Sequence, residues 1–198
     1  MQWIATERIS GMVPAPGGLA FVQDLLNSTS DRLSAPTHKY PDLLLDLSSA
    51  QEWLAAAVKS LGEAHGVDLS VPSLSEKDLP HLREVREELR RLISDPTGAR
   101  PTLLVAATVT IETVPGPRFV TAPTGEGWRW VASAVLTECL NAQQDGTWHR
   151  LKICPNPQCV ATFYDRTRNN NGVWHSTRTC GNPANLRASR ARKRESAH

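Results

Sequence analysis

Residues 154–180 read CPNPQCVATFYDRTRNNNGVWHSTRTC and determine how the C-terminal quarter of the chain folds. They contain two ligand pairs of equal spacing, Cys154-x4-Cys159 and His175-x4-Cys180, separated by 15 residues. Zinc takes four sulfur or nitrogen ligands in a tetrahedron, and two short pairs joined by a hairpin supply them with little chain to order. The spacing therefore predicts one zinc ion held by Cys154, Cys159, His175 and Cys180.

Two other interpretations of these cysteines stay open from the residues alone: free thiols with a histidine nearby by chance, or a disulfide between two of the three. An iron–sulfur centre normally takes four thiolates, so the histidine favours zinc. With four protein ligands no coordination position is left for a substrate water, and the predicted zinc is structural. A segment of about 30 residues buries too little surface to fold alone, so the metal would supply much of its stability.

The residues between the two ligand pairs predict a β-hairpin. Val160, Thr162 and Tyr164 alternate as in a strand. Residues 169–172 tolerate a turn with positive φ, and residues 173–174 resume an extended stretch. We expect the metal ligands to lie at the ends of this hairpin.

The residues after Cys180 predict a basic helix. Asn182 followed by Pro183 is a helix-start signature, because asparagine caps free amides and proline at the first helical position has a preset φ. Leu186 is the only large apolar residue in this segment, so we expect the helix to stay frayed beyond its first turns until a polyanion neutralises it. Arginine suits phosphates and guanine edges. The candidate nucleic-acid contacts are Arg166, Arg168 and Arg178 of the zinc module and Arg187, Arg190, Arg192, Lys193 and Arg194 of the tail.

Charge is divided unevenly along the chain. The whole sequence carries +2, but residues 1–149 hold 12 Lys and Arg against 18 Asp and Glu, a net charge of −6. Residues 150–198 hold 10 against 2, a net charge of +8. This pattern is typical of an acidic body with a basic, anion-seeking end, the alternative being a merely solvated tail. We place a domain boundary here and expect the body, residues 1–149, to fold without the zinc module, residues 150–198.

The expected fold class is α+β, a mostly helical N-terminal domain with one β-hairpin, followed by the zinc-stabilised hairpin module and the basic C-terminal helix. β-branched residues between 103 and 123 predict the two strands of the body, with Pro115-Gly116-Pro117 as their turn. Apolar residues at helical spacing predict helices over residues 19–26, 49–66, 78–93 and 127–141. The second of these should begin with a capping box, either Ser48 with Gln51 or Ser49 with Glu52, and end at Gly66.

No catalytic constellation stands out in the body, and we expect no enzyme. Cys139 has no metal-spaced neighbour and is interpreted as a buried small hydrophobe. A small-molecule ligand of the body is left open, because nothing in the sequence points to its identity. The histidines lack a spaced partner that would define a base or a metal site, and we interpret them as surface or capping residues: His38, His65, His81 and His149.

Composition and the placement of the cysteines indicate the cellular compartment. No apolar stretch approaches the ~18 residues of a membrane span, and no signal peptide pattern opens the chain. Three of the four cysteines share one short window instead of forming a framework spread along the chain. We expect a soluble cytoplasmic protein in a reducing compartment, without a membrane partner.

The chain resembles two known families at these positions. Residues 154–159, residues 163–166 and Cys180-Gly181-Asn182 before a basic helix resemble the CGNR zinc finger of bacterial proteins. Residues 19–28, LAFVQDLLNS, and the Arg-rich segment 78–90 resemble the ABATE domain that usually precedes this finger. The resemblance covers nearly the whole chain. It implies a transcriptional regulator linked to stress, in which the finger binds DNA and the ABATE domain senses an unidentified signal.

Two positions depart from the CGNR pattern. The third ligand, usually cysteine, is His175, which keeps the tetrahedron. Pro183 replaces the arginine that completes the family's name; if that arginine contacts DNA in relatives, this chain has lost one contact and only the cluster from Arg187 to Arg194 can replace it. The predicted function is a DNA-binding transcription regulator with duplex DNA as its partner. The alternatives are a zinc-stabilised protein-interaction module, or an RNA binder, and the sequence does not indicate an oligomeric state.

Overall fold

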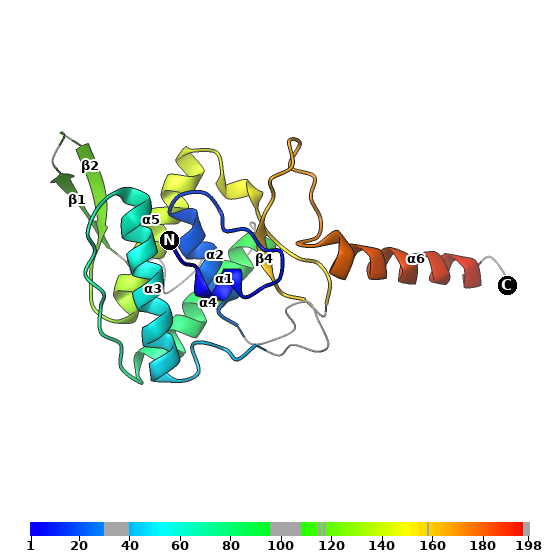
Figure 1. The fold of residues 1–198 in the computed structure, drawn as a ribbon, viewed down its shortest axis with the longest axis horizontal. Coiled ribbons are helices and arrows are strands. Elements are labelled where there is room, and N and C mark those ends of the chain that lie inside the picture. The colour runs from blue at the N-terminus through cyan, green and yellow to red at the C-terminus, as the bar shows by residue number, and fades with distance from the viewer. Residues whose placement is uncertain (30–39, 96–107, 115, 117, 158, 196–198) are drawn as a thin grey trace.

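The computed structural model describes residues 1–29, 40–95, 108–114, 116, 118–157 and 159–195. It confirms the α+β class: a helical body with one hairpin is followed by a small cysteine-rich unit and a last helix, α6 (Asn182–Glu195). This last helix projects away from the rest of the molecule (Figure 1). Within the described ranges, no helix is long and apolar enough to cross a membrane.

The body is built around α2 (Leu19–Asn27), whose nine residues are all buried. Phe21 of this helix packs against Trp53 and Trp130 of two neighbouring helices. Such burial on every side explains why its sequence, LAFVQDLLN, is more apolar than an amphipathic helix requires. The helices that contact it are α1 (Ile4–Glu7), α3 (Leu47–His65), α4 (Asp78–Ser94) and α5 (Trp128–Gln144).

Polar side chains of α2 connect it to its neighbours. Asp24 accepts hydrogen bonds from Thr6 N at 2.7 Å and from Trp53 Nε1 at 2.8 Å. Burial raises the pKa of this carboxyl to about 6, although the hydrogen bonds from Thr6 and Trp53 act to lower it. Asp24 thereby fixes α1 and α3 against the central helix.

Helix α3 begins with a different cap from the predicted one. Asp46 has extended backbone angles, and its Oδ1 accepts a hydrogen bond from Ser49 N at 2.9 Å. Both predicted capping boxes are wrong because Ser48 and Ser49 already lie inside the helix, where their backbone is helical. Gly66 ends the helix as predicted, with a left-handed φ of 67°.

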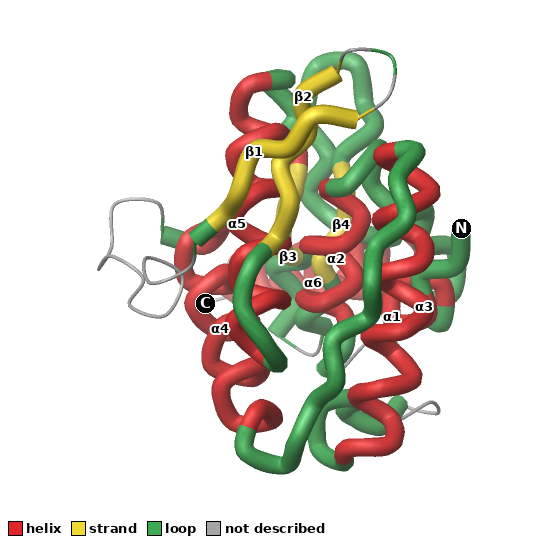
Figure 2. Tube along the Cα trace, turned by 90° about the vertical axis from the view of Figure 1, so that its left-hand side faces the viewer, coloured by secondary structure: helices red, strands yellow, loops and turns green. Residues whose placement is uncertain are grey.

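The hairpin of the body consists of β1 (Val109–Val114) and β2 (Arg118–Pro123), paired antiparallel with Ile111 opposite Thr121. It packs on α5 at the end of the body shown at the top of Figure 2. Gly116 takes a positive φ of 95°, as a tight turn requires. The rest of the predicted turn, Pro115 and Pro117, and the predicted strand start at residues 103–107 lie outside the described residues.

His65 lies in the last turn of α3 with its side chain 34% exposed, and it has a carboxylate partner that the sequence did not indicate. Its Nε2 lies 2.8 Å from Oε1 of Glu138, whose side chain is only 5% exposed. This contact joins the end of α3 to α5, and no local sequence pattern indicates that these two helices pack together. His81 stacks on Trp128, with ring centroids 4.8 Å apart. His38 lies outside the described residues, and Cys139 is buried as predicted.

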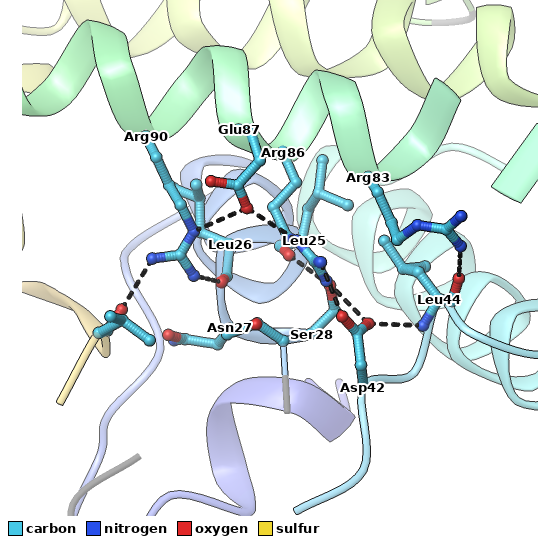
Figure 3. A network of polar contacts seen from close by, with 12 residues as sticks. Leu25, Leu26, Asn27, Ser28, Asp42, Leu44, Arg83, Arg86, Glu87 and Arg90 are labelled. Atoms are coloured by element: carbon cyan, nitrogen blue, oxygen red, sulfur yellow. Dashed lines mark hydrogen bonds and ion pairs between the residues drawn. The ribbon is translucent and has the colours of Figure 1, made fainter. Parts of the chain in front are cut away.

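Arginines of α4 close the C-terminal end of α2 (Figure 3). Arg86 forms a buried ion pair with Asp42, with Nη2 and Oδ2 2.7 Å apart. Arg90 donates to Leu26 O and, at 3.0 Å, to Val160 O of the cysteine-rich unit. The last carbonyls of a helix have no partner within it, so these donors stabilise the end of α2. One arginine thus bridges the central helix and the cysteine-rich unit.

Candidate metal centre

Two of the four metal ligands, Cys154 and Cys159, lie at the turn of a hairpin other than the predicted one, whereas His175 and Cys180 follow it outside any strand. The strand β4 (Thr162–Tyr164) pairs antiparallel with β3 (Leu151–Ile153), which precedes Cys154. The predicted partner, residues 173–174, has no strand conformation. The reason is that the first ligand pair itself forms the turn: Cys154 N donates to Ala161 O at 2.9 Å, and Cys159 N donates to Asn156 O at 2.7 Å.

The structure brings the four predicted ligands together. Their ligand atoms lie within 4.8 Å of one another. His175 Nδ1 lies 3.3 Å from Cys159 Sγ and 3.6 Å from Cys180 Sγ. Zinc bonds of about 2.3 Å to sulfur and about 2.0–2.1 Å to nitrogen place these atoms roughly 3.5 Å apart in a tetrahedron. The cluster therefore fits one four-coordinate structural zinc, with Nδ1 as the histidine ligand atom.

The surroundings of the cluster position its ligands. Asn156 Nδ2 donates to Cys180 Sγ at 3.2 Å, a contact that stabilises the negative charge of a metal-bound thiolate. Gly181 has no room for a side chain, because a Cβ there would come within 2.9 Å of the Trp174 ring. His175 Nε2 is buried and has no hydrogen-bond partner among the described residues. The polar contacts of this imidazole therefore run through Nδ1, the atom that faces the thiols.

The thiols influence each other's protonation. A hydrogen bond from Cys159 lowers the pKa of the Cys154 thiol, and the same pairing raises the pKa of Cys159. Zinc binds thiolates, so loading the metal must release the remaining thiol protons. Acid is therefore expected to weaken zinc binding.

Cys180 lies in a helical run that begins earlier than predicted. The π-helical turn η3 (Thr177–Gly181) leads directly into α6. Its cap is Ser176, whose side chain accepts a hydrogen bond from Thr179 N at 3.2 Å, whereas Asn182 already has helical backbone angles. The predicted cap at Asn182 is wrong for this reason, and the wider π turn accommodates Pro183, which has no N–H to donate. The last metal ligand and the basic helix thus belong to one continuous helical piece.

A lysine and a buried aspartate hold the loop between β4 and His175. Lys152 Nζ donates to Asp165 Oδ2 at 2.7 Å and to the carbonyls of Asn170 and Gly172 at 2.8 and 3.0 Å. Burial opposes ionisation of Asp165, but Lys152 and backbone donors outweigh it and lower the pKa of this carboxyl. Asn170 takes the left-handed conformation predicted for this turn, with φ 50°. The loop therefore has a defined shape beside the metal centre.

The candidate nucleic-acid contacts all lie on exposed surface. Arg178 lies on η3 directly before α6, and Arg168 lies in the loop held by Lys152. Arg166 is engaged with the protein itself, since its guanidinium donates to Pro14 O at 2.6 Å and lies 5.6 Å from the Tyr164 ring centre. The remaining five lie on α6: Arg187, Arg190, Arg192, Lys193 and Arg194.

Buried hydrogen bonds join the metal module to the body. Asn27 Oδ1 accepts a hydrogen bond from Thr162 N at 2.8 Å, and its Nδ2 donates to Thr162 O at 2.9 Å. Gln23 Nε2 donates to the same carbonyl at 3.2 Å. Asn27 and Thr162 are fully buried, so these bonds form away from water. They cross the predicted boundary at residue 149, and independent folding of the body stays a prediction.

Sequence reasoning missed the residues that hold the centre in place. Asn27 and Gln23 are polar positions in an otherwise apolar helix, and this is the signal that could have marked them as partners of a distant backbone. Asn156 and Asp165 lie within the segments that resemble the CGNR finger, but that resemblance does not give their partners, and Lys152 carries no comparable signal.

Fold and site together define a zinc-finger protein, in which a helical domain holds a Cys3His hairpin module that continues into a basic helix. Comparison with known families agrees: residues 150–193 match the CGNR zinc finger, and residues 19–148 match ABATE, described as "Putative stress-induced transcription regulator". The ABATE match covers more than half of the chain, and the chain belongs to this family. A search of curated proteins gave no match.

Proposed function

We propose that the finger and α6 bind duplex DNA, and that the chain regulates transcription without an enzymatic activity of its own. The observation that carries this proposal is the helical piece from Thr177 to Glu195. It begins within the metal module, projects from the body (Figure 1), and carries exposed cations along its length. The family description supports the regulatory role.

The dimensions and charge of α6 suit the major groove. A groove about 12 Å wide admits one α-helix, and a helix that presents cations to both walls can pair with phosphates on both strands. Arg187, Arg190 and Arg194 lie at helical spacings of three and four residues and therefore share a face, with Arg192 on the opposite side. The groove walls can thus be contacted from one helix.

The main role of the metal module is to orient α6, and it supplies few of the DNA contacts itself. Cys180 anchors the start of the helical piece at the zinc site, two residues after Arg178. The body has a net charge of −6, which repels DNA and leaves the +8 end to face it. We therefore assign orientation to the zinc and affinity to α6, with Arg168 at the edge of the surface.

The test is fluorescence anisotropy of a labelled duplex of random sequence, titrated with the zinc-loaded full chain at low salt. We expect saturable binding that weakens log-linearly as salt is raised. Removing zinc with a chelator should weaken binding, because α6 loses its anchor. The absence of measurable binding at low salt would contradict the proposal and favour an acidic protein surface as the partner of the basic helix.

A further inference from the structure

A cavity of about 520 Å³ lies in the body between α4, α5 and the β1–β2 hairpin. Leu89 and Leu92 of α4, Leu140 of α5, Val109 of β1 and Trp148 form apolar parts of its wall. The volume falls within the range of about 300–1,000 Å³ that is usual for small-molecule sites. The cavity lies apart from the metal centre and the basic helix, so neither explains it.

The described residues that line the cavity carry no charge. None of its described lining residues is an aspartate, glutamate, lysine, arginine or histidine. Cys139 also lines it, and burial raises the pKa of this thiol, so it stays neutral near pH 7. A charged ligand would lose its hydration here without gaining a counter-charge. The chemistry of the wall therefore selects an uncharged molecule.

The mouth of the cavity exposes apolar surface and a few polar groups. Val109 is 41% exposed and Leu140 is 50% exposed, and both line the cavity. Thr121 and Gln143 also line the cavity, and neither side chain makes a hydrogen bond with another described residue. An apolar wall with a small number of available polar groups is what orients a small ligand.

Two residues of this cavity also face the zinc module. Leu92 and Trp148 also line a second cavity, of about 530 Å³, together with Ile153, Pro155 and Val173. Trp148 begins the short 3-10 helix η2 (Trp148–Arg150), and this helix runs directly into β3. A molecule in the first cavity would therefore touch side chains that brace the metal-bearing hairpin.

We propose that the first cavity binds an uncharged, largely apolar small molecule, and that its contacts with Leu92 and Trp148 change how the zinc module is held on α4. The second half of this statement rests on the proposed function, because a change in the module matters through DNA binding. The first half concerns the body alone.

The uncharged fluorescent probe N-phenyl-1-naphthylamine tests the binding site on the zinc-loaded full chain. We expect saturable binding that Leu140→Glu weakens about tenfold, since it replaces leucine-sized apolar contact with a charge. Leu140→Trp narrows the mouth of the cavity without adding charge and should weaken probe binding as well. Leu45→Glu, at a side chain 64% exposed and outside the cavity, is the matched control and should bind as the unchanged chain does. Equal binding by all variants, or no saturable binding, overturns the proposal.

The link to the zinc module has its own readout. Probe at a concentration near its Kd for the unchanged chain should change the duplex DNA affinity of that chain, and the change should be much smaller in Leu140→Glu at the same concentration. Probe binding without any change in DNA affinity overturns the link and leaves the cavity as a site. A chain that binds the probe but no DNA refutes the proposed function and removes the link with it, while the cavity stands.

Discussion

Replacing Asn27 by alanine tests whether the body and the metal module stabilise each other through their buried hydrogen bonds. The Asn27 side chain is fully buried and makes both hydrogen bonds to the backbone of Thr162. Its removal leaves Thr162 N without an acceptor, whereas Thr162 O keeps the donor Gln23. An unsatisfied buried group costs about 1–3 kcal/mol, and the cavity left by the amide adds to this. We expect the variant to lose about 2–3 kcal/mol of stability.

For a chain of this length the loss corresponds to a fall in Tm of roughly 4–12 °C. The assay is thermal unfolding of the zinc-loaded chain, followed by circular dichroism. Zinc affinity should fall too, because Thr162 follows Cys159 by three residues in the same hairpin. Asn185→Ala, at an exposed position of α6, is the control and should leave Tm unchanged. A Tm shift in Asn27→Ala no larger than in this control would refute the coupling.

Three further outcomes follow from the site and the body. His175→Cys should keep stoichiometric zinc by elemental analysis, because a thiolate can fill the same tetrahedral position. His175→Ala should bind zinc more weakly, and equal zinc in both variants would contradict the ligand role. Chelation should leave most of the helical signal in place but lower Tm, and a full collapse of helicity would place the boundary elsewhere. The hydrogen bond that His65 donates to the Glu138 carboxylate raises the pKa of His65 against the effect of burial, so the stabilisation by this pair is present below about pH 6.5 and is lost as pH rises through the raised pKa. The Tm difference between the unchanged chain and Glu138→Gln should shrink over that rise, and a constant difference would exclude this pair as its source.

The local parts of the fold are readable from the sequence. Leu19–Asn27, Asp78–Ser94 and the end of α3 at Gly66 agree with prediction, because apolar spacing and a left-handed glycine act within a few residues. The ligand set is readable for the same reason, since both pairs are close in sequence and zinc restricts their identity. The cap of α3 could not be predicted in this way. Asp46, Ser48 and Ser49 all offer a side-chain oxygen near the helix start, and local spacing does not show which of them accepts from the free amide.

Interactions between distant segments could not be predicted in this way. Asn27 and Thr162 are 135 residues apart, and His65 and Glu138 are 73 residues apart. Periodicity shows that a polar side chain faces the core but does not identify its partner. The strand β3 was missed because three residues give no periodicity, and its pairing depends on the turn that the first cysteine pair forms. The position and pairing of such short strands depend on the metal ligands and on tertiary contacts.

The salt dependence of DNA binding tests the central claim most directly, that α6 supplies the phosphate contacts. Each contact contributes about 0.9 to the slope of log affinity against log salt, so four alanines should flatten the slope by as much as ~3.6. The fourfold variant combines changes at Arg187, Arg190, Lys193 and Arg194, none of which is a metal ligand. The control removes four exposed cations of the body by alanine: Lys59, Lys77, Arg91 and Arg129. The account predicts a flattened slope and lost binding at physiological salt in the first variant only, with zinc content unchanged in both. An undiminished slope in the first variant would contradict it and move the contacts to Arg166, Arg168 and Arg178.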